Sequence, residues 1–302
     1  MHANDQRLSS IQAVFDYQPD ALLAPGNDIP SFFPGVKVQV FHGFDSGKKG
    51  KYRIRGNFDL YCTQGPKTTR GFSQQKEAIR KPWFDVVETG WSKLDPLFQL
   101  SHEADEYRDD RPVILYAPTF SPKLRSTYAL LDEITRLAMA KDWQWLVKFH
   151  PKVTKEEVDM YEAIEGDNVR VIYTDSVQLL LQAADVLVSD TSSIISEFAL
   201  QGKAVVTFRN RKPESWMRNV IEAKDVAEKI ELALSPDKAT LAGIEQHCND
   251  IHPYKDGRSA ARVVDAVESL IDSEGRHLHK KPRNYFREWK LKKEFKSLGY
   301  KI

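Results

Sequence analysis

Five short apolar runs alternate with helix-like segments between residues 111 and 209, and this alternation constrains the fold more than any other feature. The runs are Val113–Ala117, Trp145–Phe149, Val169–Tyr173, Asp185–Ser189 and Ala204–Phe208. Between the first two runs, Leu130, Ile134 and Leu137 recur at helical spacing. Strands that alternate with helices of this length pair in parallel through crossover connections. The sequence therefore predicts a doubly wound α/β sheet in this region.

The first hundred residues show a weaker form of the same pattern, which predicts a second, smaller α/β unit. The expected strands are Ala21–Pro25, Lys37–Phe41, Asp59–Thr63 and Asp85–Glu88, with a helix at Lys67–Lys81. The polar segment Leu100–Arg111 is typical of a linker. We therefore expect two Rossmann-like α/β domains, a short N-terminal one at 1–104 and a nucleotide-binding one at 105–272, followed by a basic, aromatic tail at 273–302. Further helices are expected at Asp225–Leu234 and Arg258–Ile271.

Composition excludes several classes of protein. The chain is 41% hydrophobic and 29% charged, which argues against disorder. Residues 276–302 hold ten Lys and Arg against two Glu, a local charge of +8, so the other 275 residues sum to −7 and do not suit nucleic acid. Two cysteines, Cys62 and Cys248, are too few for a disulfide framework or a cysteine-based zinc site. Because no His/Asp/Glu cluster has metal spacing either, neither a metal nor a cofactor is expected.

The chain ends bear on localisation. The first residues lack the apolar stretch of a signal peptide, and no run approaches the roughly 18 apolar residues of a membrane span. A soluble, cytoplasmic protein is expected, at most peripheral at the inner face of the cytoplasmic membrane. Residues 284–298 mix lysines with aromatic side chains, which suits an anionic membrane surface. Alternatively, this segment is a helix packed over the first domain with its charged face in water.

A histidine follows the predicted strand Lys37–Phe41 and stands directly before Gly43. The glycine lets the backbone turn sharply, which displays the His42 imidazole at the strand tip. There it could remove a proton from an attacking hydroxyl. Alternatively, His42 only hydrogen-bonds a loop. Gly43 itself and Lys48, in the same loop, are further candidates for contact with a ligand.

Lys148 and His150 end the predicted strand Trp145–Phe149 and precede Pro151. Two residues apart in a strand, their side chains are expected to point to the same face. Two nitrogen donors at this place suit a diphosphate and would offset negative charge that builds on a leaving group. The alternative is a pair of solvated edge residues, although Lys148 interrupts an otherwise apolar run.

A run of small polar residues links the strand Asp185–Ser189 to a helix: Asp190, Thr191, Ser192 and Ser193. Free backbone N–H groups at a helix start, with hydroxyls as extra donors, favour a phosphate site. Ordinary N-capping needs only one such residue. Glu197, one turn further on, could accept hydrogen bonds from ribose hydroxyls or be a plain surface glutamate. Arg258, at the start of the last core helix, could reach a phosphate or be solvated.

Six short motifs occur in an order and spacing that resemble the CDP-glycerol glycerophosphotransferase family, which builds teichoic-acid-like polymers. They spread over residues 38–268 and are Phe41-His42-Gly43, Gly90–Asp95, Tyr116–Phe120, Lys148–Pro151, Ser189–Ser193 and Asp256-Gly257-Arg258. The resemblance implies a GT-B-like fold with the active site between two Rossmann-type domains. It also implies that His42 is the general base on the acceptor hydroxyl. Lys148, His150 and the Ser192–Ser193 turn would hold the CDP diphosphate, and Thr119, in the third motif, is a further candidate.

The resemblance implies transfer of glycerol phosphate, or a similar polyol phosphate, from a CDP-activated donor to a hydroxyl of a lipid-linked or polymeric cell-envelope acceptor, with release of CMP. Two departures bear on the donor. Thr191 replaces an aromatic residue of the family, and Glu197 stands where nucleotide-sugar enzymes of this fold often place a ribose-binding glutamate. The alternative is a GT-B glycosyltransferase or UDP-sugar 2-epimerase-like enzyme, which would release a nucleoside diphosphate. A non-catalytic nucleotide-binding protein is the third class, because the first domain is short.

Overall fold

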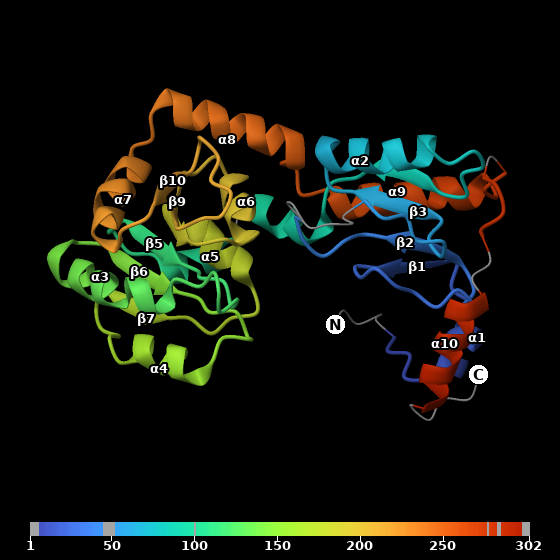
Figure 1. The fold of residues 1–302 in the computed structure, drawn as a ribbon, viewed down its shortest axis with the longest axis horizontal. Coiled ribbons are helices and arrows are strands. Elements are labelled where there is room, and N and C mark those ends of the chain that lie inside the picture. Colours follow the sequence, from blue (N-terminus) through green and yellow to red (C-terminus); the bar gives the residue numbers. More distant parts are fainter. Residues whose placement is uncertain (1–5, 45–51, 100, 277, 283–284, 298–302) are drawn as a thin grey trace. The chain divides into compact units, whose positions relative to one another are not determined.

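The computed structural model describes residues 6–44, 52–99, 101–276, 278–282 and 285–297, and the chain forms two compact units (Figure 1). Unit 1 comprises residues 1–93, 251–254 and 258–302, and unit 2 comprises residues 94–250 and 255–257. This division differs from the expected one. The chain returns to the first unit after residue 257, so the last core helix and the C-terminal segment belong with the N-terminal strands.

Unit 1 is built on a parallel four-stranded sheet in the order β1-β2-β3-β4. Its strands are β1 (Ala21–Ala24), β2 (Val36–Gln39), β3 (Leu60–Thr63) and β4 (Asp85–Glu88). The helices of this unit are α1 (Ile11–Tyr17), α2 (Pro66–Glu77), α9 (Ser259–Asp272) and α10 (Tyr285–Ser297). The four strands predicted from the sequence are confirmed, whereas the helix expected to reach Lys81 ends at Glu77.

The sheet of unit 1 is covered on both faces, as the alternation along β3 shows. Tyr61 stacks on Phe72 of α2, with ring centroids 4.7 Å apart. Its neighbours in the strand, Leu60 and Cys62, pack with Val263 of α9 in a separate cluster. Successive side chains of a strand point to opposite faces, so α2 and α9 lie on opposite sides. This packing places α9 in unit 1.

Unit 2 is a doubly wound parallel sheet of six strands in the order β10-β9-β8-β5-β6-β7. The strands are β5 (Val113–Tyr116), β6 (Gln144–Val147), β7 (Val169–Val171), β8 (Val186–Ser189), β9 (Val205–Phe208) and β10 (Arg218–Val220). The five strands predicted here are confirmed with slightly shorter bounds, and β10 was not predicted. Because β6 and β8 flank β5, the chain reverses direction across the sheet there, and ligands bind at such a switch point.

The helices of unit 2 connect these strands. They are α3 (Thr127–Ala140), α4 (Lys155–Glu162), α5 (Val177–Ala183), α6 (Ile194–Ala199), α7 (Val226–Leu234) and α8 (Lys238–Ile251). Short 3₁₀ segments occupy η1 (Ser92–Phe98), which crosses the boundary between the units, η2 (His102–Tyr107) and η3 (Ala223–Asp225). The long helix α8 was not predicted from the sequence.

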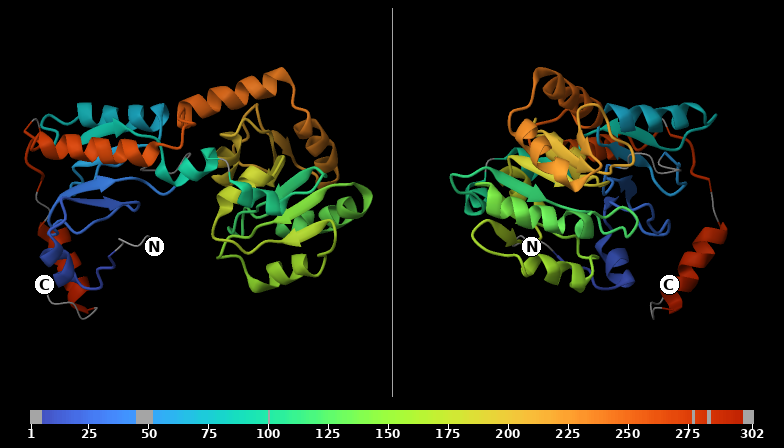
Figure 2. Two further views of the ribbon diagram at one scale, coloured as in Figure 1. Left: turned by 180° about the vertical axis from the view of Figure 1, so that it is seen from behind. Right: turned by 60° about the vertical axis from the view of Figure 1, so that its left-hand side comes forward.

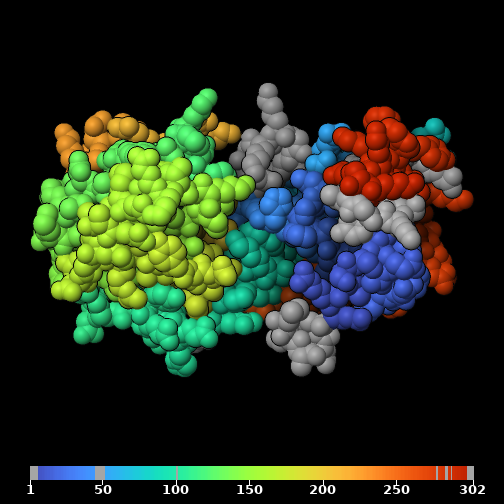
Figure 3. Space-filling view, turned by 90° about the horizontal axis from the view of Figure 1, so that it is seen from below, coloured from blue at the N-terminus to red at the C-terminus, as the bar shows by residue number. Residues whose placement is uncertain are grey.

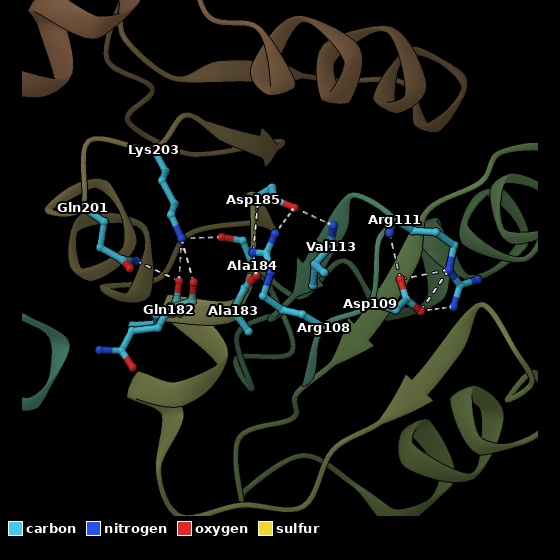
Figure 4. A network of polar contacts seen from close by, with 11 residues as sticks. Arg108, Asp109, Arg111, Val113, Gln182, Ala183, Ala184, Asp185, Gln201 and Lys203 are labelled. Atoms are coloured by element: carbon cyan, nitrogen blue, oxygen red, sulfur yellow. Dashed lines mark hydrogen bonds and ion pairs between the residues drawn. The ribbon is translucent and has the colours of Figure 1, made fainter. Parts of the chain in front are cut away.

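A polar network holds the amino edge of the unit 2 sheet (Figure 4). The ammonium of Lys203 donates to the carbonyls of Gln182 at 2.9 Å and Ala184 at 2.7 Å, which satisfies the end of α5. Arg108 pairs with Asp185 at 3.1 Å, and Asp185 also accepts from the backbone of β5. Burial lowers the pKa of Lys203 to about 8. This edge is structural, because its polar groups are occupied by one another.

The helix α10 stands clear of the sheet of unit 1, as both views in Figure 2 show. Phe295 contacts Phe32 with ring centroids 6.0 Å apart, which attaches α10 to the segment after β1. In the part of the chain that the structure describes, no helix combines the length and the apolar character that a membrane crossing would require.

Candidate functional site

The carboxyl ends of the parallel strands of unit 2 share one edge, and the predicted site residues of this unit follow those ends. Thr119 lies after β5, Lys148 and His150 after β6, and the turn 190–193 after β8. Since β5 is the neighbour of both β6 and β8, the three loops are adjacent. The fold thus brings the three sequence segments together at the switch point of the sheet.

Asp190 joins two of these loops. Its carboxylate accepts the N–H groups of Thr119 at 3.0 Å and Thr191 at 2.7 Å. It also accepts the N–H of Ser126 at 3.1 Å and its hydroxyl at 3.0 Å. The side chain is fully buried, and burial raises its pKa, while these hydrogen bonds act in the opposite direction. Asp190 therefore fixes the loop after β5 to the turn after β8, and its oxygens face protein donors.

The hydroxyls that follow Asp190 remain near the surface. The Thr191 hydroxyl accepts the N–H of Arg211 at 3.2 Å, and the Ser192 hydroxyl accepts that of Ile194 at 3.5 Å. Ser193 takes the N-cap position of α6 without a side-chain capping bond, and it is exposed. The turn thus leaves Ser192 partly exposed and Ser193 exposed.

Glu197 lies within α6 and is buried, with 3% of its surface exposed. The plain surface role considered from the sequence therefore does not describe this residue. A buried carboxylate needs hydrogen-bond partners, whether from the protein or from a ligand.

The strand β6 ends at Val147 rather than at the expected Phe149, so Lys148 lies outside the strand and His150 three residues beyond its end. Their relative direction is set by the loop, so the argument from strand alternation does not apply. Lys148 is half-buried, and its ammonium donates to the carbonyl of Phe149 at 3.2 Å. One residue past the end of β6, the N–H of Lys148 still donates to the carbonyl of Tyr116, the last residue of β5, at 2.9 Å.

The His150 ring has a defined tautomer. Its Nδ1 accepts the N–H of Lys152 at 3.1 Å, so in the neutral ring the proton resides on Nε2. Partial burial, with Lys152 and then Lys148, lowers the pKa of His150 below its ordinary value. The ring lies 4.4 Å from that of Phe120, centroid to centroid. His150 thus offers a fixed N–H donor that an anionic ligand would favour.

In unit 1, His42 follows β2 at the carboxyl edge of the sheet. Phe41 adopts the left-handed region with φ 60°, which turns the chain before the histidine. The Nδ1 of His42 lies 2.9 Å from the carbonyl of Pro25, and the ring is exposed. A carbonyl only accepts, so Nδ1 carries the proton and the lone pair is on Nε2. This tautomer leaves Nε2 free to act as a base.

The other candidates of unit 1 have different surroundings. The carbonyl of Gly43 accepts from the Gln64 amide at 3.0 Å, which ties the loop after β2 to the end of β3. Arg258 occupies the N-cap position of α9 and is exposed. Lys48 lies outside the described residues.

Two motif residues prove structural. Gly90 has φ 82°, and a Cβ there would lie 2.4 Å from the hydroxyl of Ser259, so only glycine fits. The next N–H, of Trp91, donates to Nε2 of the fully buried His252 at 3.0 Å. Sequence reasoning missed His252, because its partner is 161 residues away. These contacts join α9 to the end of β4.

Within the described residues, no group of three or more His, Cys, Asp or Glu is arranged to hold a metal ion. A cavity of about 750 Å³ lies in unit 1 and is lined by residues including Asp20, Val36 and Asp59. These residues flank the amino ends of β1, β2 and β3, opposite to the edge that carries His42. The cavity therefore contains none of the predicted site residues.

Comparison with known proteins identifies the family of this two-unit α/β chain as one of transferases. Residues 76–269 match the family described as CDP-glycerol:poly(glycerophosphate) glycerophosphotransferase. The chain belongs to this family, and its fold is GT-B-like.

Two relatives carry names from teichoic acid synthesis. The teichoic acid ribitol-phosphate primase of Bacillus spizizenii is 24% identical over 290 residues, which cover 81% of this chain and 72% of the relative. The teichoic acid glycerol-phosphate primase of the same organism is 29% identical over 151 residues, 45% of this chain and 38% of the relative. The two names differ in the polyol.

Solved structures agree on the fold. A variant of the wall teichoic acid polymerase TagF, soaked with CDPG, superposes with a TM-score of 0.63 at 15% identity, covering 84% of this chain and 72% of that one. The complex of Staphylococcus aureus MnaA with UDP has a TM-score of 0.60 at 16% identity, covering 91% and 81%. At these identities the likeness concerns the fold alone.

Proposed function

We propose that the protein transfers a polyol phosphate, with glycerol phosphate from CDP-glycerol as the lead donor, to a hydroxyl of a lipid-linked or polymeric cell-envelope acceptor. The observation that carries this proposal is the edge of unit 2 where Asp190 holds the hydroxyl turn against the loop after β5. The neighbouring loop supplies Lys148 and the Nε2–H of His150. Hydroxyls, an N–H donor and a cation together suit a diphosphate.

In the proposed reaction, the acceptor oxygen attacks the phosphorus that bears the polyol. The bond from this phosphorus to the oxygen bridging the two phosphates breaks, and CMP leaves with that oxygen. Nε2 of His42 takes the proton of the acceptor hydroxyl, because Nδ1 already donates to Pro25. Lys148 and His150 stabilise the negative charge that grows on the departing CMP.

The donor contacts follow from the geometry of the turn. Ser192 and Ser193 donate to the diphosphate, whereas Asp190 and Thr191 position the turn through their bonds to neighbouring loops. Glu197 is proposed to accept from the ribose, and Thr119, Gly43 and Arg258 remain further candidates for contact. Since protein groups supply the positive charge, we propose a metal-independent reaction, and turnover should persist in EDTA.

A product assay tests the proposal. The protein is incubated with CDP-glycerol, CDP-ribitol or UDP-sugars and a polyol-phosphate acceptor, and the released nucleotide is identified. We expect CMP, and the faster of the two CDP donors identifies the polyol. Release of UDP would favour the glycosyltransferase or epimerase alternative, and nucleotide binding without any release would favour a binding protein. Either outcome would refute the proposal.

We also propose that the protein acts as a peripheral protein at the cytoplasmic face of the membrane, through α10. Three aromatic side chains of this helix are exposed: Tyr285 by 66%, Phe286 by 74% and Trp289 by 57%. At 100° per residue they share one arc with Lys293 and Lys296, while Glu288 and Glu294 project elsewhere. The helix is exposed on the face of unit 1 that Figure 3 shows. Aromatic rings among lysines suit an anionic lipid surface.

A further inference from the structure

The loop between β9 and β10 is attached at its start to the turn proposed to hold the donor. The side-chain amide of Asn210 donates to the carbonyl of Asp190 at 2.7 Å. The backbone N–H of Arg211 donates to the hydroxyl of Thr191 at 3.2 Å. The first half of this loop therefore has a fixed position beside the turn 190–193.

The second half of the loop is fixed by aromatic and ionic contacts. The Trp216 indole N–H donates to Glu214 at 2.8 Å, and the ring lies 4.6 Å from that of His247 on α8. His247 in turn lies 3.4 Å from Glu214 through Nδ1 and 3.1 Å from the Ser196 hydroxyl of α6 through Nε2. Trp216 is buried, with 3% of its surface exposed, and Gly243 of α8 leaves room for it. Both ends of the loop are thus held on the α6 side of the sheet.

The loop exposes three cations: Arg211 and Lys212 between these anchors, and Arg209 just before the first one, where its Nε donates to the carbonyl of Ile221 at 2.9 Å. Glu214, the one acid of residues 209–217, is engaged with Trp216 and His247. Throughout the described part of unit 2, no carboxylate pairs with any of the three cations. Other arginines of the unit do pair with carboxylates, namely Arg108, Arg111, Arg125, Arg136 and Arg218. The loop therefore concentrates positive charge beside the turn that no carboxylate of the described residues neutralises.

We infer that Arg211 and Lys212, with Arg209, bind a phosphodiester group of a polyol-phosphate chain. A guanidinium matches two phosphate oxygens, and a loop held at both ends loses little entropy when it binds. The inference rests on the proposed function. It assigns these cations to the acceptor chain, because Lys148, His150 and the hydroxyls of Ser192 and Ser193 already serve the donor diphosphate. A phosphate of the donor is the other source of the same chemistry.

Direct binding measurements on the full chain test this inference. The double variant Arg211→Gln, Lys212→Gln is compared with Lys141→Gln, Lys238→Gln, which removes the same charge at the opposite edge. Lys141 precedes β6, and Lys238 follows Asp237, which pairs with the first residue of β10. The probe is a fluorescently labelled glycerol-phosphate oligomer, followed by anisotropy at increasing salt. CDP-glycerol binding is measured separately by calorimetry.

We expect the loop variant to bind the oligomer about tenfold more weakly, with a shallower salt dependence, while the control variant matches the unaltered protein. Arg211→Lys alone, which keeps the charge, should lose less oligomer affinity than the double variant. If CDP-glycerol affinity falls instead, the loop binds phosphate from the donor and the assignment to the acceptor is overturned. Unchanged affinity for both ligands overturns the inference entirely. A chain that binds the oligomer through this loop yet releases no CMP would refute the proposed function alone.

Discussion

The buried carboxylate of Asp190 provides the sharpest test of the site, because Asp190→Asn changes one atom and leaves the shape intact. In either orientation, the new amide group faces protein N–H donors. If the new NH₂ group points toward Thr191, the half-exposed N–H of Thr191 loses its acceptor. If it points toward Ser126, the fully buried N–H of Ser126 loses its acceptor. The first orientation costs less, since water can reach Thr191. The loss of one charge-assisted bond and the weakening of the others amount to about 2–3 kcal/mol.

For a domain of the size of unit 2, this cost lowers the melting temperature by roughly 5–10 °C. Calorimetry would measure the change, and hydrogen exchange would localise it to the loops that hold Thr119 and Ser126. The control is Asp132→Asn, the same replacement at an exposed position of α3. If Asp190→Asn were as stable as the control, the Asp190 carboxyl would be protonated in the native protein, and our account of an ionised acceptor would be wrong.

Four further predictions test the other groups. His42→Ala should leave donor affinity unchanged and slow turnover by roughly 100-fold, and a rate near that of the unaltered protein would remove His42 from the mechanism. Donor binding, measured by titration calorimetry, should tighten as pH falls below the ordinary histidine pKa of 6.5, because the pKa of His150 is lowered and its positively charged imidazolium forms only below that pH. The variant His150→Gln should lack this pH dependence. Between pH 8 and 10.5, Lys203 binds fewer protons in the folded chain than in the unfolded chain, so the free energy of unfolding should rise with pH. Thermal unfolding of Lys203→Met should show a smaller rise over the same range. Phe286→Ser with Trp289→Ser should weaken sedimentation with anionic vesicles roughly tenfold or more, and equal sedimentation would exclude α10 as the contact.

The sequence predicted the strands well because short apolar runs bounded by polar residues carry a local signal. It missed β10, whose three residues include Arg218 and Asn219, since neither is typical of a buried strand. The sequence-based domain division put α9 in the C-terminal domain, whereas in the structure this helix packs on the sheet of unit 1. The helical spacing of Val263, Val267 and Leu270 shows that one face is buried, but not which sheet buries it.

The candidate site divides in the same way. Lys148, His150 and the turn 190–193 could be singled out as candidates because they follow apolar runs, and the parallel arrangement of the strands brings them to one edge. The tautomers of His42 and His150 could not be predicted from the sequence, because each depends on a backbone atom of a loop, and residue spacing does not specify where that atom lies. The cationic loop at 209–212 carried no motif, and its attachment to Thr191 emerged only from the structure.

What the amino-acid sequence by itself determined was the alternation of strands and helices and the kind of residue at each strand end, because both are local properties of the chain. Tertiary structure decided which strand ends are neighbours and which polar groups are already satisfied. Asp190 illustrates the reason: as a sequence residue it was a candidate ligand contact, yet donors 64 and 71 residues away occupy its oxygens. Hydrogen bonds over such separations depend on the packing of the whole sheet.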